Sequence, residues 1–447
     1  MSAIHQPVKD NELHRLATLK TMRYLLPLMC AIYFLSFIDR TNVGMAKSAL
    51  QHQFGIGPEV YGFGAGIFYW AYALCEVPSN LMAYRVGPRR WIARIAVSWG
   101  ILSSAMMFVQ GDWSFVTLRV LLGIAEAGLF PALMYVTTLW FAQRDRSVAV
   151  GLIYIAPSLG LIVGSILGGA LMQLDGLLGL AGWQWMFLIE GLPTIVLGVI
   201  LLFVFPDRPK DAAWLTPAEA EILEARAAGG ASPHHVKGAW LTALKHPTTL
   251  LMGLIYFFNQ VGFVGLYFFA PAMVQQMHIT TPFYIGLLSA SVGLGFLLGV
   301  LALPRVHSRV TNDFAYLAVL TAGDAITAAA FMLIPDMTVR IALFVANAFF
   351  AGGILPIYWA VSMKRLHGIQ AAAGLAMINT IGLLGGFTGP YVFGLVEKST
   401  GTSLSAFGVI LVTALIGLAL IPLLARAFNA SDELEAGAVR PSVGKAV

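Results

Sequence analysis

The chain has 447 residues, of which 58% are hydrophobic and only 11% are charged. Because about a quarter of the residues of an ordinary soluble domain are charged, this composition excludes such a domain and indicates a chain surrounded by lipid. The formal net charge of +5 does not indicate nucleic-acid binding, since the basic residues are spread over loops between apolar segments. Cys30 and Cys75 both fall within apolar segments, so neither a disulfide framework nor a metal cluster is expected.

Long apolar segments recur along the whole chain. The first of them, residues 25–46, is too long for a signal-peptide core and lacks a small-residue cleavage site, so we expect it to remain as the first membrane helix. A helix of about 20 apolar residues crosses a bilayer, and the chain holds twelve such segments, six in each half. The predicted spans are 25–46, 61–83, 91–109, 114–140, 147–172, 185–205, 248–275, 282–303, 313–335, 339–362, 369–395 and 403–428.

A polar stretch, residues 206–247, separates the two halves. Thr216 and Glu219 have the spacing of a capping box, which predicts a surface helix in this linker. The GxxP pattern occurs at Gly128–Pro131 and again at Gly353–Pro356, which suggests duplicated halves with a site between them. The predicted domains are an N-terminal tail (1–24), an N-terminal bundle (25–205), the linker (206–247), a C-terminal bundle (248–428) and a C-terminal tail (429–447).

The basic residues predict the orientation of the chain in the membrane. Of the 27 Lys and Arg residues, all except Arg40, Lys47, Arg119, Arg340 and Lys398 lie on one side, in the tails, the even-numbered loops and the linker or at Arg94. Loops rich in Lys and Arg stay on the cytoplasmic side of a membrane. We therefore expect both termini to be cytoplasmic and the protein to span a bacterial inner membrane.

Six motifs are spread in order over both halves of the chain. They are FIDRTNVG (37–44), EVPSNL (76–81), RVGPRRW (85–91), IAEAGLFP (124–131), GWQWMFLIEGLP (182–193) and INTIGLLGGFTGPY (378–391). With these motifs the chain resembles the anion:cation symporter branch of the major facilitator superfamily. The resemblance implies an all-α membrane protein of twelve helices in two pseudo-symmetric six-helix bundles. It also implies alternating access and proton-driven uptake of organic anions such as sugar acids, tartrate or aromatic acids. One position departs from the pattern, since Tyr84 stands where many facilitators carry an aspartate.

Charged residues within the predicted spans are costly and indicate function or a structural ion pair, and four of them lie on the first and fourth spans. Asp39 and Arg40 are adjacent and point about 100° apart, so they need not neutralise each other. Arg119 and Glu126 share a helix face but lie about 10 Å apart along it, so a direct bond is not assured. The resemblance assigns proton coupling to Asp39 and Glu126, with Arg119 as the electrostatic partner of Glu126. Arg40 is expected to attract the anion.

The resemblance places four further residues at a substrate cavity: Tyr72, Trp359, Asn379 and, less directly, Tyr358. Aromatic residues of membrane helices also pack structurally, and a buried amide also bonds to another helix, so both interpretations stay open. Glu76 and Glu190 lie toward the ends of their spans and are interpreted as structural, and Asp324 has no assigned role.

These patterns predict a proton-coupled transporter of a small organic carboxylate that works as a monomer in the lipid bilayer. No nucleophile–base pair, metal-ligand cluster or nucleotide motif occurs, so neither an enzyme nor a cofactor other than the coupling proton is expected. Two alternatives remain: proton-driven efflux of a drug or metabolite, and a membrane sensor that does not transport.

Overall fold

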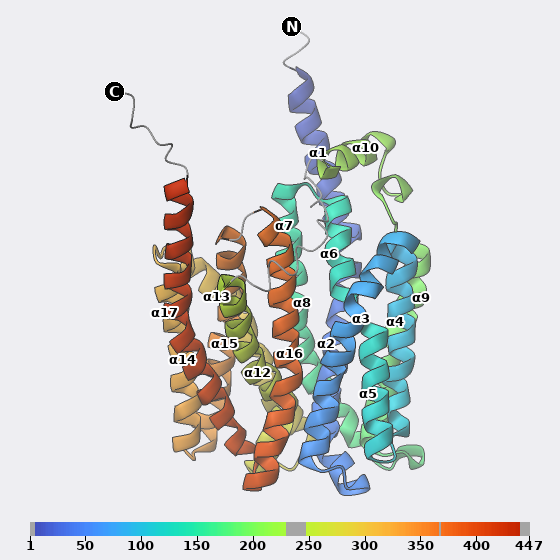
Figure 1. Ribbon diagram of the computed structural model, residues 1–447. Coiled ribbons are helices and arrows are strands. Elements are labelled where there is room, and N and C mark those ends of the chain that lie inside the picture. The colour runs from blue at the N-terminus through green and yellow to red at the C-terminus, as the bar shows by residue number, and fades with distance from the viewer. Residues whose placement is uncertain (1–4, 229–246, 366–367, 439–447) are drawn as a thin grey trace, which may run out of the picture.

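The structure is a computed structural model that describes residues 5–228, 247–365 and 368–438. Within these ranges the chain is helical and has no strand, and its long helices run roughly side by side (Figure 1). The first turn of α1 and the last turn of α17 lie at the same end of the molecule (Figure 1). We call this end the terminal face and the opposite end the distal face.

The N-terminal half begins with a helix that precedes the first predicted span. Its elements are α1 (His5–Tyr24), α2 (Leu26–Phe54), α3 (Pro58–Val86), α4 (Pro88–Ala105), α5 (Asp112–Glu126), α6 (Leu129–Trp140), α7 (Gln143–Ile153), α8 (Ile155–Leu171) and α9 (Gly182–Val204). The linker contributes α10 (Pro217–Ala228). The C-terminal half contains α12 (Pro247–Gln276), α13 (Pro282–His307), α14 (Asp313–Leu333), α15 (Met337–Arg365), α16 (Gly368–Thr400) and α17 (Phe407–Ala438).

The described segments include ten that are long and apolar enough to cross a membrane. Helices α3 and α16, of 29 and 33 residues, are long enough as well and complete the twelve predicted spans. These two helices pack along each other and join the bundle α2–α9 to the bundle α12–α17 (Figure 1). Because part of their surface meets the other bundle rather than lipid, they need fewer apolar residues than the outer helices.

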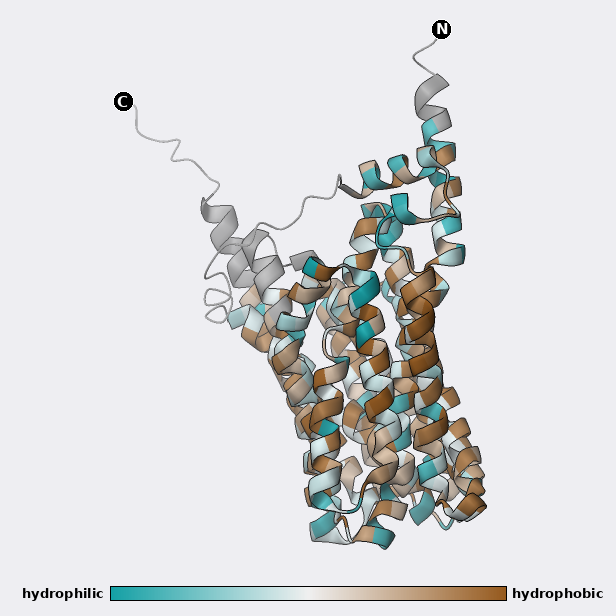
Figure 2. Ribbon diagram, turned by 90° about the vertical axis from the view of Figure 1, so that its right-hand side faces the viewer, coloured by the Kyte–Doolittle hydropathy of each residue, from teal (hydrophilic) through white to brown (hydrophobic). Residues whose placement is uncertain are grey.

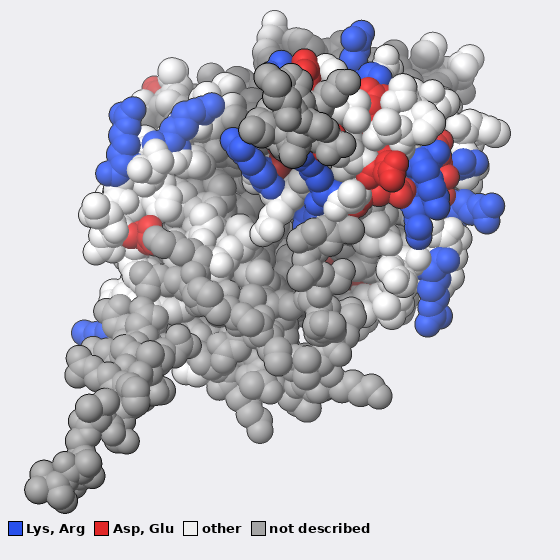
Figure 3. Space-filling model, turned by 90° about the horizontal axis from the view of Figure 1, so that it is seen from above, with Lys and Arg blue, Asp and Glu red and all other residues white. Residues whose placement is uncertain are grey.

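The outside of the bundle is suited to lipid. Figure 2 shows hydrophobic residues along the length of the helices and hydrophilic residues gathered toward the terminal face. On α9, the side chains of Val196, Ile200 and Phe203 recur at helical spacing and are 56%, 42% and 79% exposed. Seen from the terminal face, Lys and Arg side chains gather over this end of the molecule (Figure 3).

Two of the predicted spans are interrupted. The span 114–140 divides into α5 and α6 at Ala127 and Gly128, directly after Glu126. Gly128 has φ 87°, and a Cβ there would lie 2.3 Å from Ser79 Oγ, so only glycine fits. Ser79 Oγ donates to the Ala127 carbonyl at 2.6 Å and so satisfies a backbone group near the break. The span 147–172 divides into α7 and α8 at Tyr154.

The linker helix α10 docks on the N-terminal half. The predicted capping box is confirmed, because Thr216 N donates to Glu219 Oε2 at 2.8 Å and Glu219 N donates to Thr216 Oγ1 at 3.3 Å. Lys20 of α1 donates to both oxygens of Glu219, at 2.7 and 2.8 Å. The ring of Trp214 stacks between those of Tyr24 and Trp140, with centroids 5.3 and 5.6 Å away.

Most of the N-terminal tail predicted at 1–24 is therefore helix α1, which packs on α10. Residues 229–246 of the predicted linker, residues 1–4 and residues 439–447 of the predicted tails lie outside the described residues.

Candidate functional site: a buried charge network beside the bundle interface

Arg40 and Glu126 form an ion pair between α2 and α5, in which Arg40 Nη2 donates to Glu126 Oε1. Both residues are buried, at 8% and 0% exposure. The Arg40 guanidinium also lies 4.4 Å from the ring centroid of Phe37 and 5.4 Å from that of Phe68, so aromatic faces share its charge. Glu126 Oε2 and Arg40 Nε have no hydrogen-bond partner. The pair thus keeps one free acceptor and one free donor.

Asp39 turns away from its neighbour Arg40, as the helical geometry predicts. Asp39 Oδ1 accepts a hydrogen bond from Ser103 Oγ of α4, and Asn42 Nδ2 donates to the same oxygen at 3.4 Å. Asp39 Oδ2 is buried and has no hydrogen-bond partner. The two adjacent residues of α2 therefore enter separate sets of contacts, one toward α4 and one toward α5.

Arg119 is fully buried but does not contact Glu126 directly. Its Nε donates to the carbonyl of Gly64 at 3.2 Å, and its Nη2 donates to that of Ala65 at 3.0 Å. The hydrogen-bonded partner of Glu126 is therefore Arg40, because Arg119 lies two helical turns away on α5 and reaches α3 instead. Arg119 interacts electrostatically with both Asp39 and Glu126, as predicted for Glu126. The four charged residues thus form one network that contains the Arg40–Glu126 ion pair.

Two of the predicted cavity residues of the C-terminal bundle, Tyr358 and Trp359, gather around Tyr256 of α12, which was not among the predicted residues. Tyr358 stacks on Tyr256 with ring centroids 5.5 Å apart, and Trp359 meets the same ring edge-on at 5.4 Å. Tyr358 is fixed in this position, since its hydroxyl donates to the Met252 carbonyl at 2.5 Å. A small crevice beside this cluster is lined by Ile255, Tyr256, Asn259, Ile354, Leu355 and Tyr358.

Tyr72 lies apart from that aromatic cluster. Tyr72 belongs to α3, is 6% exposed and packs its ring 6.0 Å from that of Phe68, which also faces Arg40 and Arg119. Asn379 is half-buried on α16. Tyr72 is thus associated with the charge network, whereas Tyr358 and Trp359 belong to the opposite bundle.

Ion pairs and hydrogen bonds join the two bundles in their distal halves. Lys47 Nζ of α2 donates to both oxygens of Glu397 of α16, at 2.6 and 2.8 Å. Lys398 pairs with Glu59 across the same seam. The Tyr61 hydroxyl is 3.2 Å from the carbonyl of Phe268, on α12. These contacts hold the bundles together toward the distal face.

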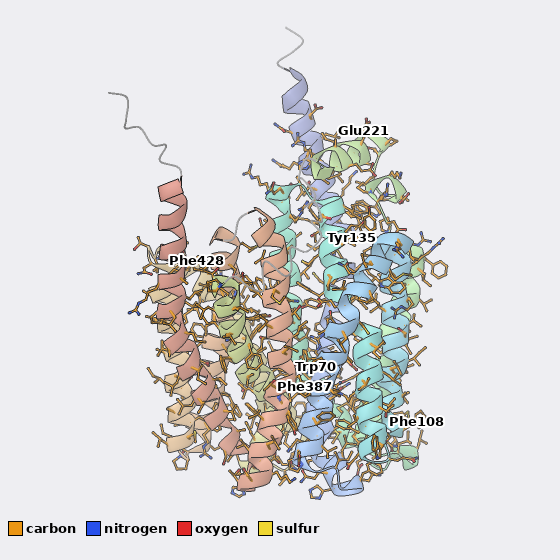
Figure 4. The ribbon with its side chains drawn as sticks, in the orientation of Figure 1. Trp70, Phe108, Tyr135, Glu221, Phe387 and Phe428 are labelled. Atoms are coloured by element: carbon orange, nitrogen blue, oxygen red, sulfur yellow. The ribbon has the colours of Figure 1, made fainter. Side chains whose placement is uncertain are left out.

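Small residues let the helices approach closely along this seam. A Cβ on Gly62 or Gly66 of α3 would lie 2.3 or 2.4 Å from the carbonyl oxygen of Pro390 or Phe387 on α16, closer than a real Cβ can approach. Trp70 and Phe387 lie next to each other at mid-height between the bundles, with ring centroids 6.3 Å apart (Figure 4). Among the described residues, the hydrogen bonds and ion pairs that side chains make from one bundle to the other lie in the distal half of the molecule or near mid-height. The network is thus closed toward the distal face.

A family model described as "Major Facilitator Superfamily" matches residues 29–390. A protein of Agrobacterium vitis named "Putative tartrate transporter" is 37% identical over 426 residues, covering 92% of this chain and 93% of its own. The "Quinolone resistance transporter" of Acinetobacter baumannii is 32% identical, covering 89% of this chain and 92% of its own. The "Inner membrane transport protein RhmT" of Escherichia coli (strain K12) is 36% identical, covering 82% of this chain and 85% of its own.

Two solved structures share the fold. A bacterial homologue of the lysosomal transporter Spinster, in an inward-facing and unoccupied conformation, superposes with a TM-score of 0.73 at 20% identity, covering 91% of this chain and 98% of its own. A D-xylose–proton symporter superposes with a TM-score of 0.69 at 17% identity, covering 90% and 97%. The predicted fold of two six-helix bundles is confirmed, and the relatives are transporters rather than enzymes. The chain belongs to the Major Facilitator Superfamily.

Proposed function

We propose that this protein imports a small organic carboxylate together with protons across a bacterial inner membrane. The chain belongs to a family of transporters, and it is similar to a protein named a putative tartrate transporter. Lys and Arg side chains gather at the terminal face, as is typical of the cytoplasmic surface of a membrane protein (Figure 3). In this orientation the structure corresponds to a transporter closed to the periplasm. The motifs that resemble the anion:cation symporter branch support an anionic substrate.

The observation that carries the proposal is the buried ion pair of Arg40 and Glu126. A buried cation needs a counter-charge, and breaking such a pair without replacement costs about 3–5 kcal/mol. A carboxylate substrate offers that counter-charge. When Glu126 takes up a proton, Arg40 loses its partner and becomes free to bind the anion. Anion binding and protonation of Glu126 therefore favour each other, which is the thermodynamic requirement for symport.

Asp39 provides a second protonatable group in the same bundle. Drawing a monoanion into a cell with a negative interior costs about 2.3 kcal/mol per 100 mV, and one proton only cancels this charge. A second proton makes net import move positive charge inward, so that the membrane potential drives uptake. Asp39 suits this role because it is buried and has one oxygen without a hydrogen-bond partner.

The substrate class follows from the groups of both bundles. Arg40 supplies positive charge on one side, and Tyr256, Trp359 and Asn379 supply aromatic faces and an amide on the other. These groups suit a carboxylate with an aromatic or hydroxylated body, such as tartrate, a sugar acid or an aromatic acid. We propose Tyr72, Tyr358, Trp359 and Asn379 as the residues that contact this body.

Proton-driven efflux is the second candidate, because one relative is named a quinolone resistance transporter. The two buried arginines, Arg40 and Arg119, suit an anion better than a cationic or neutral amphiphile. The direction of proton-linked flux separates the two functions. If the protein is an importer, tartrate or a sugar acid should enter proteoliposomes together with protons when the outside is acidic. If it is an exporter, its cargo should leave the proteoliposomes as protons enter.

Purified protein should be screened first by thermal shift against tartrate, sugar acids and aromatic carboxylates, since a ligand stabilises the state that it binds. A hit that also accumulates under an acidic exterior supports the proposal. Accumulation of no tested anion, together with proton-driven extrusion of an amphiphile such as a quinolone, would replace it by efflux.

A further inference from the structure

A second group of buried polar residues lies on the other side of α2 from Glu126. Asp39, Asn42 and Glu190, which we call the acid cluster, are 5%, 0% and 5% exposed. Glu190 belongs to α9, which packs against both α2 and α4. A Cβ on Gly168 of α8 would lie 3.7 Å from Glu190 Oε1, so the carboxyl is enclosed by α2, α8 and α9. The position of Glu190 toward the end of its span predicts a structural role, which would require hydrogen bonds.

Glu190 makes no hydrogen bond of ordinary geometry, although the side chain of Asn42 lies within range of its carboxyl. Both of its carboxyl oxygens are buried without a hydrogen-bond partner, and so are Asn42 Oδ1 and Asp39 Oδ2. All four unpartnered atoms are acceptors, and Asn42 is a neutral side chain that is fully buried beside the two acids. Buried polar atoms normally have partners. Trp99 Nε1 of α4 is a buried donor beside Asp39, whereas no hydrogen atom lies between the Glu190 carboxyl and Asn42 Oδ1.

The charges around the acid cluster explain why a hydrogen is needed. Asp39 and Glu190 are close enough to interact electrostatically, and Asn42 lies within range of both carboxyls. The cation that faces the cluster is Arg119 of α5, which acts on Asp39. Arg40 and Lys47 of α2 are paired with Glu126 and Glu397, helix α8 contains no charged residue, and Glu190 is the only charged residue of α9. One cation cannot neutralise two buried carboxylates, so the cluster needs one further positive charge.

We propose that Glu190 is an additional proton-binding site, which holds one proton in alternation with Asp39 across the amide of Asn42. As a neutral acid, Glu190 donates its O–H to Asn42 Oδ1, and Asn42 Nδ2 donates to the ionised Asp39. When Asp39 takes up a proton, the repulsion between the two acids disappears and Glu190 can release its own. This inference rests on the proposed proton-coupled uptake and gives it a third titratable carboxyl beside Asp39 and Glu126.

The test is infrared difference spectroscopy of the full-length protein in liposomes, titrated between about pH 5 and about pH 9. A protonated carboxyl has a carbonyl stretching band that a carboxylate lacks. We expect Glu190→Gln to remove one titrating band of the wild type. This variant keeps the shape of the side chain, and its amide can donate to Asn42 Oδ1, so the fold is preserved. The matched control Asp324→Asn alters a buried acid of the other bundle, which accepts from Asn347 at 2.7 Å, and should leave the Glu190 band unchanged.

The link to Asp39 is tested in a protein that retains Glu190. In Asp39→Asn the neighbouring negative charge is gone, so the Glu190 band should disappear at a pH lower by about one unit or more than in the wild type. A Glu190 band that titrates identically in both proteins, or a wild-type spectrum unchanged by Glu190→Gln, overturns the inference. If uptake of tartrate by the wild type does not depend on the pH gradient, the proposed function is wrong instead. The infrared spectra measure protonation of Glu190 without transport, so the two outcomes can be told apart.

Discussion

Arg40 and Glu126 are 86 residues apart in the chain, yet they form a buried ion pair between α2 and α5. The pair lies among aromatic rings, where the Arg40 guanidinium also contacts the face of Phe37. Each partner therefore stabilises the charge of the other in a largely buried place. This relationship makes Glu126 both a structural partner of Arg40 and, when protonated, the group that releases it.

Replacing Arg40 alone is expected to destabilise the protein strongly. Arg40→Gln leaves the Glu126 carboxylate without its counter-charge, and such a loss costs about 3–5 kcal/mol. The double variant Arg40→Gln/Glu126→Gln removes both charges and should recover most of the melting temperature, while stabilisation by tartrate stays absent. A thermal-melt series on the wild type, both single variants and the double variant measures this. Equal destabilisation by the single and the double variants would argue against the pairing.

Gly128 is expected to be essential for the position of Glu126. In Gly128→Ala, the side chain must adopt φ 87°, which costs roughly 1–2 kcal/mol, and the new methyl group meets Ser79 Oγ at 2.3 Å. We expect a lower melting temperature and slower uptake. Gly151→Ala is the control, because this glycine lies in the regular helix α7 and a Cβ there meets nothing within 4 Å. A control that is as damaging as Gly128→Ala would show that general helix changes, rather than the break, cause the loss.

The ion pair of Lys47 and Glu397 is expected to stabilise closure toward the distal face. Lys47→Ala leaves a buried carboxylate on α16, so the closed state loses stability and the open state becomes more populated. A loss of about 1.4 kcal/mol raises the open-to-closed ratio tenfold. A cysteine placed at Ala270, which is 1% exposed on α12, should then react faster with an impermeant maleimide added from the distal side.

That labelling requires a background in which Cys30 and Cys75 are replaced by serine. Lys47→Glu/Glu397→Lys restores opposite charges and serves as the control, for which slow labelling is expected. Fast labelling of the double reversal, or unchanged labelling of Lys47→Ala, would show that this pair does not hold the seam closed.

The docking of α1 on α10 is expected to depend on pH through Glu219. Burial alone raises the pKa of Glu219, but hydrogen bonds from Lys20 and Thr216 and the charge of Lys20 outweigh it and lower the pKa below its usual value. The stabilisation is therefore complete above the ordinary glutamate pKa, about 4.3, and is lost as the pH falls through the lowered value. The protection of the amides of α1 and α10, measured as their exchange rate relative to the intrinsic rate at the same pH, should fall in acid in the wild type. In Glu219→Gln the protection should be lower at neutral pH and change less in acid.

The apolar pattern predicts the helices well but not their partners. Twelve long apolar segments require twelve spans, because lipid leaves few other solutions for the backbone. Arg119 and Glu126 share a helix face, but their spacing does not indicate which neighbouring helix each side chain contacts. In the structure Glu126 pairs with Arg40 of α2. Arg119 donates to the carbonyls of Gly64 and Ala65 of α3. Direct contact depends on the packing of α2, α3 and α5, which no local pattern encodes.

Local signals were informative where they have a local cause. The capping box at Thr216 correctly marked the start of α10, since its hydrogen bonds lie within four residues. Helix α1 was missed because its sequence is polar, and its contacts with α10 join residues about 200 positions apart. Gly128 indicates a break in the helix after Glu126. The need for glycine at this position, however, depends on Ser79, a residue of another helix.

The most direct test of proton coupling compares uphill uptake with exchange in the same proteoliposomes. We expect Asp39→Asn and Glu126→Gln to lose accumulation of tartrate driven by an acidic exterior, by up to about tenfold per pH unit for each coupled proton. Exchange of labelled for unlabelled tartrate, which needs no net proton movement, should persist in both variants. Unchanged uphill accumulation in both variants would contradict the roles of Asp39 and Glu126.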